Sequence, residues 1–168
     1  MRKPEGSYIM TQPELEQAAA KRLTANGLTL SVAESCTGGL LSKRITDVAG
    51  ASKFYKGGAC TYCNEIKHKI LGVRTETLER YTAVSQQTAA EMAQGIARVY
   101  ETDLGIGITG YAGPDGGEDG TPVGTIYIGL CCKGETQVHK ILSPNGRQQA
   151  RQDAADEALR MILHAIPE

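Results

Sequence analysis

The segment Ser31–Leu41 (SVAESCTGGLL) constrains the fold more than any other part of the chain. The residues before Glu34 are apolar and β-prone, as in a short strand, and the apolar spacing after Gly39 is that of a helix. A strand that turns directly into a helix leaves backbone N–H groups at the helix start free to bind a phosphate or a developing oxyanion. A side chain at this corner, Ser35 or Cys36, can also attack an electrophile. The segment therefore predicts an anion site, a nucleophile, or both.

Strand and helix patterns along the rest of the chain predict an α/β fold. We expect strands over 28–33, 57–63, 104–109, 123–132 and 136–142, and helices over 12–25, 40–48, 65–71, 75–81, 86–100 and 147–166. The last two strands flank Lys133-Gly134-Glu135 and form an expected hairpin. This order implies a three-layer α/β/α sandwich with a mixed, mostly parallel sheet that contains at least one antiparallel strand. Residues 1–10 are expected to form a flexible N-terminal tail, and residues 11–168 a single domain.

Composition and charge argue against several kinds of partner. The net charge of −1 gives no general attraction to a polyanion, and one Phe and no Trp provide no platform on which bases could stack. We therefore expect no nucleic-acid partner. Without a run of about 18 apolar residues we expect no membrane segment, and a cytoplasmic location. The five cysteines fit a reducing compartment. Cys60 and Cys63 match C-x-x-C, but the odd spacing sends them to opposite faces of a strand and no second ligand pair follows, so no metal is expected.

The corner contains neither a Walker loop nor a Rossmann fingerprint, which leaves Ser35 and Cys36 as possible nucleophiles. A thiol is intrinsically more nucleophilic but needs a neighbouring cation to form thiolate. A hydroxyl needs a positioned base, and a lysine serves where its ammonium is destabilised.

Lys67 fits that requirement for a base. If Asn64 caps the helix that follows, Lys67 lies in the first turn, where the helix dipole and the nearby Lys69 lower its pKa. Tyr62 shares a strand face with Cys60 in the expected strand and is placed to relay a proton. The alternative is that Lys67 is a solvated surface lysine and Tyr62 an ordinary strand residue, because spacing alone does not bring the segments together.

Four stretches in this order resemble the CinA C-terminal domain family, which includes the stand-alone nicotinamide-nucleotide amidases. They are AESCTGGLL (33–41), TYCNEIKHKILGV (61–73), AVSQQTAAEMAQG (83–95) and TGYAGPDGGEDGTPVGT (109–125). The resemblance covers roughly residues 12–165. It implies an α/β/α fold, a homodimer, and hydrolysis of nicotinamide mononucleotide to nicotinic acid mononucleotide and ammonia. It also implies a serine–lysine mechanism without metal or cofactor, on a small-molecule nucleotide substrate.

The resemblance carries roles over to individual residues. By motif, Ser35 is the nucleophile, Lys67 its general base and Tyr62 an assisting hydroxyl. Thr109 and Arg147 are carried over as residues that bind or orient the substrate. The backbone N–H groups of Thr37, Gly38 and Gly39 are our own candidates for the oxyanion hole, and Gly110 begins a glycine-rich loop that is expected to contact the substrate. Because SPNGRQQAR matches less closely than the other motifs, Arg151 is an alternative to Arg147 as the phosphate ligand.

Two positions depart from the family pattern. Cys63 stands where relatives usually have Ser, which leaves the acyl-transfer groups intact. Tyr111 stands where a smaller aliphatic residue is commoner, and a ring there narrows the pocket or stacks on the substrate.

Two alternatives stay open: Cys36 as the nucleophile, and a non-catalytic nucleotide-binding or regulatory paralogue of the same fold.

Overall fold

The computed structural model describes residues 9–168, so most of the expected tail (1–10) lies outside the described residues. Helices and strands are interspersed along this part of the chain. The helices are α1 (Gln12–Ala25), α2 (Leu40–Thr46), α3 (Asn64–Leu71), α4 (Thr75–Tyr81), α5 (Gln86–Tyr100) and α6 (Arg147–Ala165), with a short 3-10 turn η1 (Ala51–Lys53). The strands are β1 (Leu30–Glu34), β2 (Tyr55–Cys60), β3 (Leu104–Gly110), β4 (Thr125–Cys132) and β5 (Glu135–Leu142).

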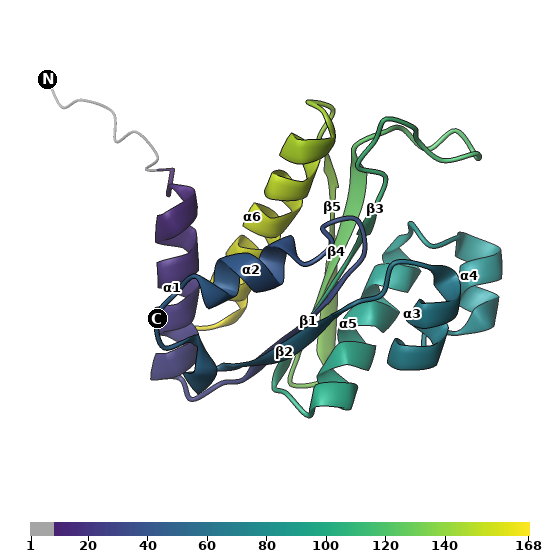
Figure 1. Ribbon diagram of the computed structural model, residues 1–168. Coiled ribbons are helices and arrows are strands. Elements are labelled where there is room, and N and C mark those ends of the chain that lie inside the picture. The colour runs from purple at the N-terminus through teal and green to yellow at the C-terminus, as the bar shows by residue number, and fades with distance from the viewer. Residues whose placement is uncertain (1–8) are drawn as a thin grey trace, which may run out of the picture.

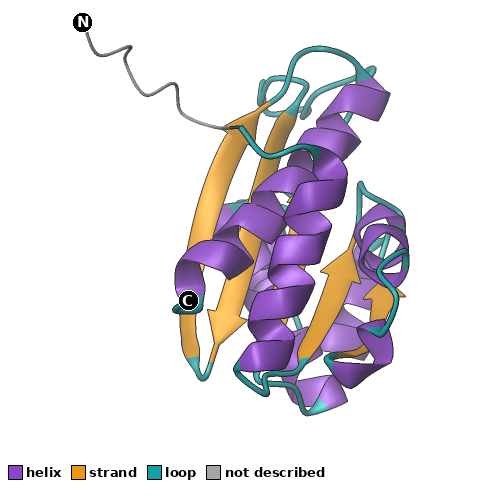
Figure 2. Ribbon diagram, turned by 90° about the vertical axis from the view of Figure 1, so that its left-hand side faces the viewer, coloured by secondary structure: helices purple, strands orange, loops and turns teal. Residues whose placement is uncertain are grey.

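The strands of the described region form one sheet in the order β2-β1-β3-β4-β5. Strand β1 is parallel to both β2 and β3, whereas β4 is antiparallel to β3 and to β5. Helices α1, α2 and α6 cover one face of the sheet, and α3, α4 and α5 cover the other (Figure 1). Turning the molecule brings α1 and α6 in front of the strands (Figure 2). The expected three-layer sandwich with a mostly parallel sheet is confirmed.

Alternate glycines in β3 explain how α5 packs so closely on the sheet. A Cβ at Gly105 would lie 2.2 Å from the carbonyl oxygen of Ala93, and one at Gly107 would lie 2.6 Å from the Ala93 nitrogen. The backbone of α5 therefore rests directly on this strand. The large residues that alternate with the glycines belong to the core on the opposite face: Leu104, Ile106 and Ile108.

The expected hairpin is confirmed, with Lys133 and Gly134 as its two-residue turn. Their φ angles of 50° and 88° are both positive. Two successive positive φ angles match the type I′ turn, whose twist suits antiparallel strands. The hairpin completes the sheet on the side away from β2.

The second strand ends earlier than its sequence predicts. We expected a strand over 57–63, but β2 ends at Cys60, and the Thr61 N–H donates to the Glu34 carbonyl oxygen at 2.8 Å before the chain leaves the sheet. The helix that follows begins at Asn64, with Cys63 rather than Asn64 as its N-cap residue. Residues 61–63 therefore form the connection between β2 and α3, and their side chains do not follow the alternation of a strand.

Candidate active site

The chain turns sharply where β1 ends at the carboxyl edge of the parallel strands. The Ser35 N–H donates to the Ile108 carbonyl oxygen of β3, and the Gly38 N–H returns to the Ser35 carbonyl oxygen, both at 3.0 Å. Gly38 and Gly39 have φ angles of 56° and 97°, a left-handed region that side chains disfavour. We call residues 35–38 the nucleophile turn. It places Ser35 at the strand end, where open α/β sheets bind their ligands.

Lys67 reaches this turn from α3. Its Nζ lies 2.9 Å from Ser35 Oγ, and it also donates to the carbonyl oxygens of Thr61 at 2.8 Å and Tyr62 at 3.0 Å. The side chains of Ser35 and Lys67 are 8% and 1% exposed. The expectation of a solvated surface lysine is therefore wrong.

Burial also sets the charge state of this amine. Among residues 9–168 no carboxylate forms an ion pair with Lys67, and its acceptors are neutral oxygens. Loss of hydration lowers the pKa of Lys67 to about 8, and the neighbouring Cys63 and Cys36 oppose that shift. The direction agrees with the sequence analysis, which attributed it to the helix dipole and Lys69. Desolvation is the main cause.

Tyr62 contributes through its main chain. Because β2 ends at Cys60, the side-chain alternation expected for a strand does not extend to Tyr62, and the prediction of a shared face with Cys60 is wrong. Its carbonyl oxygen accepts from Lys67 Nζ and, at 3.4 Å, from Ser35 Oγ. Its ring is 61% exposed, and its hydroxyl accepts from Arg147 Nη2 at 3.3 Å.

The start of α2 is already occupied by a carboxylate that the sequence analysis did not assign a role. Glu34 is 1% exposed and accepts hydrogen bonds from the N–H groups of Leu41 at 2.8 Å and Ser42 at 3.0 Å. The first turn of α2 is therefore not open to a substrate anion, which corrects the general expectation of free N–H groups at the helix start. An acidic residue that ends a buried strand just before a helix was the available signal.

The N–H groups that the sequence predicts as oxyanion donors, those of Thr37, Gly38 and Gly39, lie before the first turn of α2. The Gly38 N–H is bound to Ser35, whereas the N–H groups of Cys36, Thr37 and Gly39 make no hydrogen bond to another residue within the described chain. Cys36 and Thr37 directly follow Ser35. They are the candidate donors for an oxyanion formed at Ser35.

A cavity of about 250 Å³ opens beside Ser35 and Lys67. Of the other predicted site residues, Tyr62, Thr109, Gly110 and Arg147 line it. Loop 110–124 adds Tyr111, Ala112, Gly113 and Asp115 to the lining. Cys36 also lines the cavity, whereas Thr37, Gly38 and Gly39 lie outside its lining.

Two of these residues also bind the surrounding chain. The Thr109 hydroxyl donates to the Ala83 carbonyl oxygen at 2.6 Å, which anchors the segment before α5. Arg147 Nη1 donates to the Gly113 carbonyl oxygen at 2.7 Å. Arg147 lines the cavity and Arg151 does not, so Arg147 is the better placed of the two arginines to meet an anionic substrate group.

The structure gives no support to Cys36 as a nucleophile, and we predict that Cys36→Ala retains close to wild-type turnover. Burial raises the pKa of the Cys36 thiol to about 11, which leaves about one molecule in a thousand as thiolate at pH 8. The measurement is kcat for nicotinamide mononucleotide, the substrate that the family resemblance implies, with iodoacetamide sensitivity as a second readout. Loss of activity in Cys36→Ala, in a protein that keeps its melting temperature, would contradict it.

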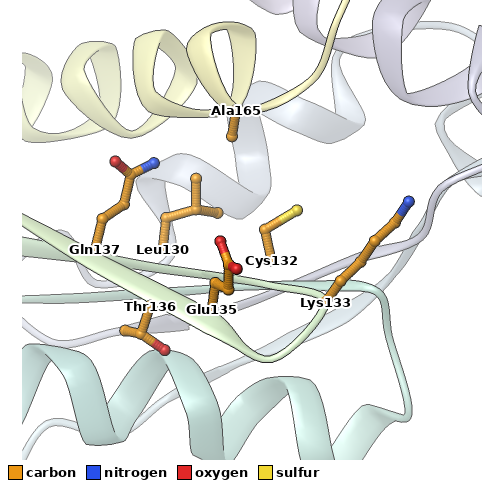
Figure 3. Close-up of a pocket in the computed structure, with 7 residues that line it drawn as sticks. All are labelled: Leu130, Cys132, Lys133, Glu135, Thr136, Gln137 and Ala165. Carbon is orange, nitrogen blue, oxygen red and sulfur yellow. The ribbon is translucent and has the colours of Figure 1, made fainter.

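A larger hollow lies elsewhere, between the β4–β5 turn and the end of α6 (Figure 3). Its volume is about 500 Å³, and its lining includes Cys132, Lys133 and Ala165. None of the predicted site residues lines it. The smaller cavity is therefore the one that contains the reactive groups.

Within residues 9–168, no group of three or more His, Cys, Asp or Glu side chains is placed to hold a metal ion. The same residues include no helix that combines the length and apolar character of a membrane span.

The family model of the CinA C-terminal domain matches residues 12–166. A CinA-like protein of Kosmotoga olearia is 45% identical over 168 residues, which cover 99% of this chain and 41% of that protein. The chain spans about two fifths of the length of the curated relatives it matches.

Solved structures match over nearly their whole length. One is described as a competence or damage-inducible protein from Enterobacter asburiae, with 42% identity, a TM-score of 0.92, and coverage of 95% of this chain and 100% of that one. Another is a CinA superfamily protein from Enterobacter cloacae, with 38% identity, a TM-score of 0.94, and coverage of 99% of both chains.

Proposed function

The chain belongs to the CinA C-terminal domain family, and on that premise we propose that it is a nicotinamide-nucleotide amidase. The proposed reaction hydrolyses nicotinamide mononucleotide to nicotinic acid mononucleotide and ammonia, in pyridine nucleotide salvage. The observation that carries the proposal is the 2.9 Å contact between Lys67 Nζ and Ser35 Oγ. A buried lysine without a carboxylate partner, in contact with a serine at a strand end, is the arrangement that a serine–lysine acyl transfer needs.

In the proposed first half-reaction, neutral Lys67 accepts the Ser35 hydroxyl proton as Oγ attacks the carboxamide carbon. The tetrahedral oxyanion faces the N–H groups of Cys36 and Thr37. The Lys67 ammonium then returns its proton to the substrate nitrogen, the C–N bond breaks, and ammonia leaves. The product of this step is an ester between Ser35 and the nicotinoyl group.

The second half-reaction uses the same groups. Lys67 accepts a proton from water, which attacks the ester carbon, and the C–O bond to Ser35 breaks as Oγ regains a proton. The carboxylate product departs. The carbonyl oxygens of Thr61 and Tyr62 keep Lys67 Nζ in place through both steps, because they accept hydrogen bonds from either of its protonation states.

The assay that tests this proposal measures ammonia released from nicotinamide mononucleotide, nicotinamide riboside and unrelated primary amides. We expect release from the mononucleotide, with nicotinic acid mononucleotide as co-product. Binding of the nucleotide by calorimetry without ammonia release from any compound would favour the non-catalytic alternative. The cytoplasmic location and the homodimer remain part of the proposal, and light scattering of the purified chain tests the latter.

We predict that Arg147→Met raises KM for nicotinamide mononucleotide by about 10- to 100-fold with a small change in kcat. Arg147 lines the cavity at its exposed rim, and a charged hydrogen bond to a phosphate contributes about 1.5–3 kcal/mol. Nicotinamide riboside, which lacks the phosphate, is the control substrate, and its KM should change little. An equal rise in KM for both compounds would contradict a phosphate-binding role.

A further inference from the structure

Arg151 lies behind the nucleophile turn and does not line the cavity. It projects from the second turn of α6, and its Nη2 donates to the Thr37 carbonyl oxygen at 2.9 Å. A Cβ at Gly38 would lie 3.6 Å from the same nitrogen. The guanidinium therefore packs directly against the turn that carries Ser35.

A continuous set of hydrogen bonds connects this guanidinium to the Ser35 main chain. The Thr37 carbonyl oxygen accepts from both Arg151 and the Leu40 N–H, the latter at 3.1 Å. The N–H of the same peptide unit, that of Gly38, donates to the Ser35 carbonyl oxygen. The peptide unit between Thr37 and Gly38 is thus held at its oxygen by Arg151 and at its nitrogen by the Ser35 carbonyl. We infer that this peptide unit fixes the orientation of the free N–H groups of Cys36 and Thr37, which lie between Ser35 and Gly38.

The charge of Arg151 is not neutralised by another residue in the described chain. No carboxylate forms an ion pair with it there, its Nη1 donates to Gln148 Oε1 at 3.2 Å, and its Nε is buried without a partner. Its positive charge lowers the pKa of the Cys36 thiol against the larger effect of burial. The field of the guanidinium therefore reaches the place where an oxyanion at Ser35 would form.

We propose that Arg151 is a positioning residue for acyl transfer at Ser35, an inference that rests on the proposed function. Its guanidinium holds the nucleophile turn so that the Cys36 and Thr37 N–H groups point at the oxyanion, and its charge favours that oxyanion. Arg147 and Arg151, both near the start of α6, then have different tasks. Arg147 binds the substrate from the cavity, and Arg151 acts on the transition state through the turn.

The kinetic test compares Arg151→Met with Arg160→Met. Arg160 is a matched control because it lies on the same helix with a partly exposed side chain and only long ion pairs of 3.7–3.9 Å. We expect Arg151→Met to lower kcat by about 10²-fold, the typical cost of a misplacement of about 1 Å, with KM within about twofold of wild type. Arg160→Met should leave both constants unchanged. A raised KM at constant kcat, or no change at all, would overturn the proposal.

Partial rescue separates positioning from folding. Arg151→Lys keeps the charge, and its kcat is expected to be about tenfold higher than that of Arg151→Met. Added guanidinium ion should raise kcat of Arg151→Ala but not of wild type. A purely structural role predicts instead a loss of melting temperature that guanidinium does not restore. Absence of rescue in a variant that melts as wild type does would count against the proposal.

Labelling of Ser35 distinguishes failure of this inference from failure of the amidase proposal. In the reaction with a fluorophosphonate ester, Ser35 Oγ forms a bond to phosphorus, fluoride leaves, and the hydroxyl proton passes to Lys67. Mass spectrometry of the intact protein measures the labelled product. If wild type is labelled without hydrolysing the nucleotide, the substrate assignment fails, and the labelling rate of Arg151→Met still tests the turn. We expect that rate to fall by about 10²-fold. Equal rates for the two proteins would overturn the role of Arg151, and an unlabelled wild type would overturn both proposals.

Discussion

Ser35→Ala is expected to lower ammonia release from nicotinamide mononucleotide by about 10⁴-fold or more, because the variant has no atom to form the acyl ester. The substitution removes one oxygen from a side chain that is 8% exposed and adds no bulk. Lys67 keeps its hydrogen bonds to the carbonyl oxygens of Thr61 and Tyr62. The fold is therefore expected to persist, and nucleotide binding by calorimetry should be retained. Steady-state ammonia release with coupled detection gives the measurement.

Ser31→Ala provides a matched control for that variant. Ser31 lies on the same strand, β1, is fully buried, and donates from Oγ to the Ile96 carbonyl oxygen at 3.2 Å, away from the cavity. It is expected to keep turnover while losing some stability, because it leaves a buried acceptor without its donor. Near-native ammonia release by Ser35→Ala would show that the serine mechanism is wrong.

The strand-to-helix corner could be predicted from sequence, and its partner could not. The change of apolar spacing around Glu34–Gly39 marks the end of one element and the start of another by local preference alone. Lys67 follows 32 residues after Ser35, and they meet because β1 and β2 are neighbours and end at the same edge of the sheet. Strand adjacency is a long-range property that local spacing does not contain. The family resemblance supplied it.

The hydrogen-bond partners around the corner could not be predicted from sequence. We expected free N–H groups at the helix start, but the Glu34 carboxylate accepts from the first turn of α2. We expected Tyr62 to lie on a strand and to present its hydroxyl to Ser35, but β2 ends at Cys60 and the Tyr62 carbonyl oxygen accepts from Lys67. The first difference arises because a nearby carboxylate accepts from the helix donors, and the second because the chain leaves the sheet before Tyr62. Residue types alone do not show which acceptor binds.

The Glu34 carboxylate limits the places where an oxyanion can be stabilised. Because it binds the N–H groups in the first turn of α2 and is stabilised by the helix dipole, only the N–H groups between Ser35 and the helix are left for the substrate. The nucleophile turn that presents them is short, ends in Gly38 with a positive φ, is followed by Gly39 with another, and is braced by Arg151. The precision of the site thus depends on contacts from β3, α3 and α6 as much as on the motif itself.

Lys67→Met is expected to lower kcat by about 10²–10⁴-fold, the usual contribution of a general base. Methionine matches the four-atom apolar stem of the lysine without its terminal amine, and its sulfur cannot accept the Ser35 proton. In wild type, the neutral amine is the active form. With a pKa of about 8, activity should rise as pH increases through that value, and about one hundredth of the sites are competent at pH 6. A pH profile of kcat/KM, measured on wild type and variant, tests both statements.

Lys69→Met is the matched control, because Lys69 is an exposed lysine on the same helix. It should keep both kcat and the rise near pH 8, whereas the small residual rate of Lys67→Met should lose that rise. If Lys67→Met retained the same pH dependence, the titrating group would be another residue, and the 2.9 Å contact to Ser35 would be structural. If Lys69→Met moved the rise to higher pH, the charge of Lys69 would be a cause of the low pKa of Lys67, as expected from the sequence. The two variants together therefore separate desolvation of Lys67 from repulsion by its neighbour as the cause of its low pKa.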